Sequence, residues 1–459
     1  MNNKEVDMLN GNLMKKIIVF AIPVMLSSIL QLLFNACDLI VVGKFAGDDS
    51  LAAVGSTTSL VSLIVNLFIG FSVGANVAVA RSIGKQDKEK CEKLVHTSIL
   101  FSLIVGVIVT LFGVFASRFC LEKMDTPSDI IGKASTYLII YFLGSIFNLV
   151  YNFGASILRA IGETRKPLIY LFIAGVVNAL LNLFLVIVCK MDVAGVAIAT
   201  VISQIISAVL VIRCLIKTEG YIHLNLKKLK IDSKSLGEIV LIGLPAGIQN
   251  SLFAISNISI QKAVNSFKST SVVAGNAASA NIGNFIYSSM NAFYQACLTF
   301  TSQNYGAKKI KNCKKVLLSS LLLVTLVGMV VGGIAVILGK PLLGLYTNGD
   351  DSIKYGLIRL TIIGLTYFTC GITDVLVGGL RGLGYSITPM IVSVLGICVL
   401  RIVWIHTVFR ANHSLQVLYY SYPLSWIVTS TIHMICYICI YKKLKKKINI
   451  DALKDLVIE

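Results

Sequence analysis

The sequence predicts an all-α integral membrane protein, in which twelve transmembrane helices form two six-helix lobes related by a parallel pseudo-twofold repeat. The composition, the long apolar stretches and a repeat at a constant offset of 222 residues support this prediction. Of the 459 residues, 56% are hydrophobic and 14% are charged, and the mean hydropathy is +0.82. A water-soluble domain of this size would lack the polar side chains that its surface needs.

Twelve stretches of the chain are long and apolar enough to cross a membrane, which takes roughly 20 residues of helix. Six lie in each half, near residues 16–42, 51–79, 95–117, 133–155, 166–189, 193–215, 237–262, 272–302, 316–338, 354–378, 388–409 and 414–441. The first stretch is too long for a cleavable signal peptide, contains polar residues and has no small-residue cleavage site after it. We therefore expect it to be the first transmembrane helix.

A motif after the fourth and tenth stretches shows the repeat most clearly. Residues 158–162 (LRAIG) and Pro167 return as residues 380–384 (LRGLG) and Pro389. The glycine is typical of a helix end, and the proline is typical of the start of the next helix. Because each half has an even number of spans, both halves begin on the same side of the membrane, and the repeat is parallel.

The basic residues predict the orientation in the membrane. The formal net charge is +19, and 29 of the 41 lysines and arginines lie on alternate loops. The positive-inside rule places these loops and both termini in the cytoplasm, so the charge favours anionic membrane lipids as partners, and not nucleic acid. We expect a monomeric, multi-pass protein of the cell membrane, with an N-lobe at 1–216, a cytoplasmic linker at 217–236 and a C-lobe at 237–459.

Cysteine and histidine patterns give no sign of an enzyme or a structural metal site. The eleven cysteines are an odd number and most lie in apolar stretches, and the pair Cys436 and Cys439 lacks the second pair that a zinc site needs. The five histidines form no HExxH motif, and the chain has no P-loop, GxSxG or dinucleotide-binding motif. We predict a transporter without a cofactor, whose energy comes from an ion gradient.

Asp38 is the first candidate for ion coupling because it lies inside the first apolar stretch. A charged carboxylate there costs about 2.5 kcal/mol or more unless it faces a wet cavity or a partner. Gln31 and Asn35 share its helix face, and we assign them to a substrate cavity. A proton or Na⁺ can neutralise Asp38, so Na⁺ at this residue is the one metal ion we consider. The alternative is that Asp38, five residues before Gly43, only reaches the outer interface.

Further polar residues follow helical spacing in other apolar stretches of the first half. Tyr137 and Tyr141 lie one turn apart in the fourth stretch, Asn178 and Asn182 one turn apart in the fifth, and Thr200 lies in the sixth. Such side chains either hold helices together or face water. Their number around one acidic residue favours a cavity beside Asp38, in which we expect Asn182 to lie near the acid and Tyr141 to face the substrate.

The second half repeats the polar pattern with different charges. The position that matches Asp38 is Ile260. The carboxylate of this half is Asp374, late in the tenth stretch, and Arg401 lies midway along the eleventh. These two could pair with one another, or Asp374 could be a second titratable group. Amides and a hydroxyl along the seventh and eighth stretches are our candidates for the substrate cavity in this half, namely Asn257, Asn284, Ser288 and Asn291.

Several of these segments resemble the multidrug and toxic compound extrusion (MATE) family. The similar segments are Pro23 to Gly47, residues 51–55 (LAAVG), both LRxxG motifs, residues 195–200 (GVAIAT) and residues 401–404 (RIVW). The resemblance covers essentially all twelve stretches. It implies a V-shaped pair of six-helix bundles that exports organic cations in exchange for H⁺ or Na⁺.

The resemblance also implies roles for individual residues. It places Asp38 in the cation site of the N-lobe, with Tyr137, Asn178 and Thr200 as neighbours. The chain departs from the family where an acid is expected at Asn182. The glutamate that one subfamily carries in the seventh helix is Phe253 here, and Asp374 lies about one turn from the tenth-helix acid of that subfamily.

The function we expect is a cation-coupled multidrug efflux antiporter that exports organic, mostly cationic amphiphiles by alternating access. The alternative is a lipid-linked saccharide flippase of the same superfamily. A flippase would present more cationic side chains to the substrate, and Arg359 and Arg401 are the candidates for that role.

Overall fold

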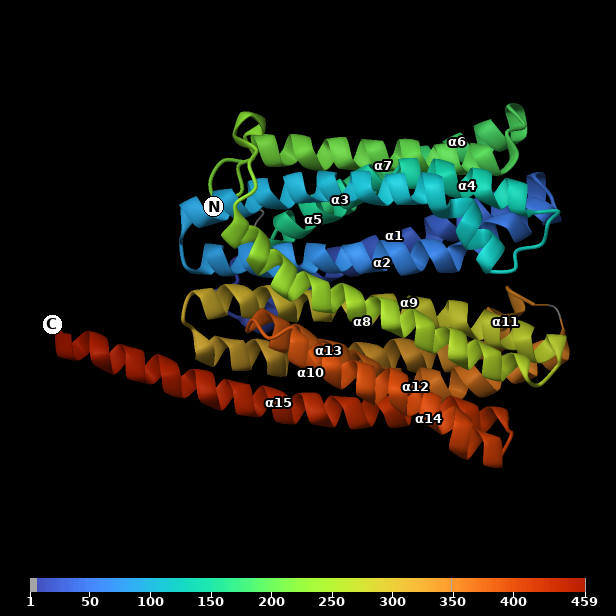
Figure 1. Ribbon diagram of the computed structural model, residues 1–459. Helices are drawn as coiled ribbons and strands as arrows, with labels where there is room; N and C mark the ends of the chain where they lie inside the picture. Colours follow the sequence, from blue (N-terminus) through green and yellow to red (C-terminus); the bar gives the residue numbers. More distant parts are fainter. Residues whose placement is uncertain (1–5, 348, 459) are drawn as a thin grey trace. The chain divides into compact units, whose positions relative to one another are not determined.

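The computed structural model describes residues 6–347 and 349–458, and these residues form helices and loops without a β-strand (Figure 1). Their contacts divide them into two compact units. Unit 1 contains Val6 and Leu26–Ser251, whereas unit 2 contains Asp7–Met25 and the described residues from Leu252 onward. These limits differ from the predicted lobe boundaries, because the first part of each half groups with the other half.

Unit 1 is built from the helices of the first half of the chain. Their bounds are α1 Leu13–Phe45, α2 Asp48–Gly84, α3 Lys88–Lys123, α4 Ile131–Leu143, α5 Ser145–Ala160, α6 Arg165–Leu183, the π-helical turn η1 Phe184–Val188, α7 Asp192–Lys217 and the short 3₁₀ turn η2 Leu226–Lys228. The first part of α1 belongs to unit 2.

Unit 2 is built from the helices of the second half. Their bounds are α8 Ser233–Asn265, α9 Thr270–Gly306, α10 Ile310–Ile337, α11 Gly339–Gly344, α12 Asp350–Gly382, α13 Ile387–Ser393, the π-helical turn η3 Val394–Val399, α14 Leu400–Trp404, the π-helical turn η4 Ile405–Phe409 and α15 Leu415–Ile458. The part of α8 up to Ser251 belongs to unit 1.

Each predicted apolar stretch coincides with a helix or with a broken helix. Ten helices in the described part of the chain are long and apolar enough to span a membrane, and α4 with α5 makes an eleventh, bent by 45°. The remaining predicted stretch is α9, a continuous helix of 37 residues that is rich in amides and hydroxyls. The structure therefore confirms the all-helical, membrane-spanning fold class.

The repeated glycines end their helices as predicted. Gly162 and Gly384 follow α5 and α12 with φ of 92° and 95°, a backbone conformation that glycine adopts without a steric penalty. Pro167 and Pro389 lie in the first turns of α6 and α13, where the backbone N–H has no helical partner to lose.

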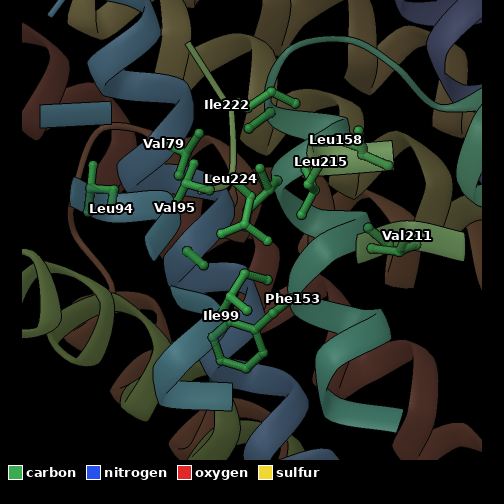
Figure 2. Close-up of a cluster of buried hydrophobic side chains, with 14 of the residues drawn as sticks. Val79, Leu94, Val95, Ile99, Phe153, Leu158, Val211, Leu215, Ile222 and Leu224 are labelled. Carbon is green, nitrogen blue, oxygen red and sulfur yellow. The ribbon is translucent and has the colours of Figure 1, made fainter. Parts of the chain in front are cut away.

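The linker between the halves packs onto the core of unit 1. Figure 2 shows Ile222 and Leu224 beside Val95 and Leu215, within a cluster of buried apolar side chains from several helices. Ile222 is 1% exposed and Leu224 is fully buried. At the end of the linker, Asp232 accepts hydrogen bonds from the hydroxyl and the backbone N–H of Ser235, which lower the pKa of the Asp232 carboxyl.

Candidate functional site

Helices α1, α6 and α7 bring four of the predicted polar residues of unit 1 into one hydrogen-bond network. The amide nitrogen of Asn182 donates to Oδ1 of Asp38 and lies 3.3 Å from Oδ1 of Asn178. Nδ2 of Asn178 in turn lies 3.5 Å from Oγ1 of Thr200. The structure therefore places Asp38, Asn178, Asn182 and Thr200 together, as the sequence predicts.

Two tyrosines of α4 complete this site. The rings of Tyr137 and Tyr141 stack with centroids 6.1 Å apart, and both hydroxyls lie near enough to Asp38 to interact with its charge. Asp38 is half-buried and forms no ion pair with a lysine or arginine among the described residues. Its carboxylate is surrounded by amide and hydroxyl groups.

An unpaired oxygen lies beside this carboxylate. Asn182 is fully buried, and its Oδ1 has no hydrogen-bond partner in the described part of the chain. A buried acceptor without a partner is costly, and a bound cation would satisfy it. One carboxylate with neutral oxygen ligands can accept a proton or a hard monovalent cation such as Na⁺.

The close packing of two helices places Asp38 beside the asparagines. Gly175 of α6 lies against the ring of Phe34 in α1, so closely that a Cβ atom at Gly175 would overlap the ring. Asp38 lies one turn after Phe34, and Asn178 and Asn182 lie one and two turns after Gly175. The missing side chain at Gly175 thus allows the contact between the two helices that carry the site.

The residues predicted to line a substrate cavity lie in different places. Gln31 and Asn35 are exposed on α1 and make no side-chain hydrogen bond with the described residues. In unit 2, Asn257 and Asn284 are exposed, whereas Ser288 is half-buried. Half-buried Asn291 donates to the Tyr287 hydroxyl at 3.4 Å. That these side chains share one cavity stays a prediction.

The possible ion pair between Asp374 and Arg401 does not form. Asp374 instead lies within hydrogen-bonding reach of the Tyr287 hydroxyl of α9 and near Arg381. Arg401 is directed to another partner, because its Nε donates to Oγ of Ser425 at 3.0 Å. Tyr287 was not singled out from the sequence, although helical spacing places it on the same face of the eighth apolar stretch as Asn284 and Asn291.

Arg401 lies in an aromatic environment together with Arg359. Its guanidinium carbon is 4.1 Å from the ring centroid of Tyr422 and 5.5 Å from that of Trp426. The guanidinium carbon of Arg359 is 5.9 Å from the same Tyr422 ring, and its Nη1 donates to Oγ of Ser279 at 3.3 Å. Sequence reasoning missed both aromatic rings, because their spacing is that of ordinary core residues.

A comparison with protein families identifies the repeat independently. The MatE family model matches residues 23–184 and again residues 245–405. The two matches begin at Pro23 and Pro245, which are 222 residues apart.

Known proteins resemble the chain over most of its length. It is 26% identical to the probable multidrug resistance protein YpnP of Bacillus subtilis over 399 residues, which is 87% of this chain and 89% of YpnP. It is 25% identical to the probable multidrug resistance protein NorM of Thermotoga maritima over 395 residues, which is 84% of each chain.

Solved structures share the fold. An outward-facing multidrug resistance MATE family transporter of the MOP superfamily superposes with a TM-score of 0.91 at 21% identity, over 97% of this chain and 100% of that one. A MOP superfamily transporter from Pyrococcus furiosus gives 0.90 at 20% identity, over 97% and 99%. The latter is described as having a binding pocket of reverse polarity that suggests a different function.

Proposed function

Because this chain belongs to the MatE family, whose members are membrane transporters and not enzymes, we propose that it is a multidrug efflux antiporter driven by H⁺ or Na⁺. Asp38 is the coupling residue in this proposal. The export of drugs is inferred from relatives that are named multidrug resistance proteins.

The observation that carries the proposal is the Asp38–Asn182 contact. Asp38 has amides and hydroxyls around it and no basic partner among the described residues, so its charge has to be neutralised by an ion from outside the chain. Binding and release of H⁺ or Na⁺ would change the free energy of the Asp38 carboxylate in the membrane. That difference can couple the ion gradient to a change of conformation.

The remaining parts of the proposal follow from this site and from the charge distribution. The substrates are organic, mostly cationic amphiphiles, which compete with the coupling ion for Asp38. The protein requires no other cofactor and acts as a monomer in the plasma membrane, with its basic loops and both termini in the cytoplasm.

The test is transport by purified protein in proteoliposomes with proton and sodium gradients imposed separately. We expect Asp38→Asn to abolish drug-dependent ion flux without changing the melting temperature by more than a few degrees. Asp351→Asn is the matched control, because Asp351 is exposed at the start of α12 and should leave the flux unchanged. Ion-coupled flux at the wild-type rate in the Asp38→Asn protein would exclude Asp38 as the coupling residue.

A second candidate function is the flipping of a lipid-linked saccharide. Arg359 and Arg401 favour it, because both guanidinium groups lie on one aromatic ring in unit 2 and could bind a phosphate. Movement of a labelled lipid headgroup across vesicles that contain the purified protein, without drug-dependent ion flux, would support this candidate over drug export.

A further inference from the structure

Unit 2 contains a group of residues at the positions that form the ion site in unit 1. Three of them follow from the repeat of 222 residues, which pairs Asp38 with Ile260, Tyr137 with Arg359 and Thr200 with Tyr422. The burial pattern supports this pairing, because fully or nearly fully buried residues recur at the same offset along α4 and α12. They are Ala134, Leu138 and Phe142 in α4, and Gly356, Leu360 and Gly364 in α12.

The fourth residue of the group is Arg401, which the π-helical turn η3 places at the position that corresponds to Asn178. The plain offset pairs Asn178 with Leu400, but Leu400 is half-buried whereas Asn178 and Arg401 are both 4% exposed. A π-helical turn accommodates one extra residue and rotates the following face of the helix. Since η3 ends at Val399, the buried position that corresponds to Asn178 is occupied by Arg401.

The two equivalent sites therefore have opposite charge. Unit 1 has one carboxylate among amides and hydroxyls, and unit 2 has two guanidinium groups and an apolar side chain. Ile260, in place of the carboxylate, is 4% exposed and lies in the same buried cluster as Tyr422 and Trp426.

Within the part of the chain that the structure describes, the two guanidinium groups have no carboxylate partner. The described residues contain no ion pair to Arg359 or Arg401, and the contacts of these two side chains are with hydroxyls and aromatic rings. Nε of Arg359 is buried and has no hydrogen-bond partner among residues 6–347 and 349–458. Unpaired positive charge inside membrane helices is costly, so these residues require an anion that the described chain does not provide.

We infer that the cluster of Arg359, Arg401, Tyr422 and Trp426 is an anion site, which binds the carboxylate or phosphate group of an amphiphile. Guanidinium groups bind these planar or tetrahedral anions through paired N–H donors, and the aromatic rings provide an apolar surface for the rest of the molecule. The inference rests on the proposed export function and extends its substrates to anionic and zwitterionic amphiphiles.

Equilibrium binding to the full-length protein in phosphatidylcholine nanodiscs tests the site without any gradient. The probe is a dansyl-labelled undecanoic acid, and its methyl ester is the uncharged reference, with empty nanodiscs as the blank. We expect the acid to bind roughly tenfold more tightly than the ester, the gain typical of a hydrogen-bonded charge pair. Arg401→Gln and Arg359→Gln should each bring the acid towards the affinity of the ester.

Arg410→Gln is the matched control, because Arg410 is an exposed arginine on the same stretch of chain and should leave the acid preference intact. If Arg401→Gln does not fold, Ile260→Asp provides a second test, since it places a carboxylate at the equivalent of Asp38 and should remove the acid preference. Equal binding of acid and ester to the wild type, or an equal loss in Arg410→Gln, would overturn the anion site.

Two further measurements distinguish a failure of the anion site from a failure of ion coupling, and a lipid phosphate from a soluble amphiphile as the bound anion. Asp38→Asn should keep the acid preference even though it abolishes transport, so failure of the anion site and failure of ion coupling give different results. Phosphatidylglycerol in the nanodiscs should compete with the acid if the anion is a lipid phosphate, and should not if it is a soluble amphiphile. Either outcome of that arm supports an anion site and identifies its source.

Discussion

The carboxylates Asp38 and Asp374 lie in predicted membrane helices, and their different neighbours indicate different roles. Asp374 is near Tyr287 and the positive charge of Arg381, whereas the described neighbours of Asp38 are neutral polar groups. A carboxylate that already interacts with a cationic side chain gains less from an external cation. This difference is the residue-level reason to expect ion coupling at Asp38.

Asn182→Asp should convert the site into a stronger Na⁺ site. A second carboxylate beside Asp38 adds attraction of about 4 kcal/mol at 4 Å in a surrounding of intermediate polarity, and part of it is lost to repulsion between the acids. We therefore expect Na⁺ affinity to rise at least roughly tenfold, measured by binding of radioactive sodium to purified protein. Asn152→Asp, on α5 and hydrogen-bonded to Asn148, is the control. An equal rise in both variants would argue against a specific site.

The sequence could identify the residues that the structure brings together around Asp38, but not the neighbours of Arg401. Polar groups inside apolar stretches, together with the family resemblance, pointed to Asp38, Asn178 and Thr200. Of the two alternatives left open for Asp374, the pairing with Arg401 does not form, because sequence spacing does not determine how two helices are rotated relative to each other. Tyr422 has the sequence signature of a core residue, and only the repeat register could have indicated its position.

At the level of elements, the contact between α1 and α6 depends on Gly175. Gly175→Ala should separate the two helices, since the new methyl group would overlap the Phe34 ring one turn before Asp38. Overpacking of this kind costs about 1–3 kcal/mol. We expect a lower melting temperature and a loss of ion-coupled transport that approaches the loss in Asp38→Asn.

Two variants distinguish the separation of α1 and α6 from a general loss of helix stability. Gly55→Ala in α2 should be harmless, because its Cβ meets no atom within 4 Å. Phe34→Leu combined with Gly175→Ala should recover part of the transport, since the smaller side chain vacates the space. Normal transport by the single Gly175→Ala protein would show that this contact does not position Asp38.

The apolar stretches could be predicted because the membrane demands long runs of apolar residues. The bend between α4 and α5 and the turns η1, η3 and η4 could not, because a local change of backbone hydrogen bonding leaves hydropathy unaltered. Two of these turns lie next to the candidate sites, as η1 follows Asn182 closely and η3 directly precedes α14. The missed details are therefore the ones that place the functional side chains.

At the level of the whole molecule, the halves of the sequence are not identical with the compact units. Asp7–Met25 packs with the second half, and the part of α8 before Leu252 packs with the first. Hydropathy shows that a helix is apolar but not which neighbour it contacts, so the sequence could not place these boundaries. The linker was predicted only as a cytoplasmic connection, yet its residues Ile222 and Leu224 are part of the unit 1 core.

Two leucines of the linker differ in burial over a short distance. Leu224 is fully buried against the unit 1 core, whereas Leu226 is 54% exposed. Leu224→Asp should destabilise the packed linker by about 3 kcal/mol, through lost burial and an introduced charge. Trypsin cleavage after Lys227 and Lys228 should then rise roughly a hundredfold, if cleavage follows the population of open linker.

Leu226→Asp introduces the same charge two residues away and should change the cleavage rate little, since surface substitutions cost within about 0.5 kcal/mol. The comparison isolates burial, because both variants lie near the same trypsin sites. Equal cleavage of the two variants would show that the contact with Leu215 and Val95 does not hold the linker. A large difference would establish that the connection between the halves is an ordered part of unit 1, so that a movement of the halves has to bend the chain outside residues 222–224.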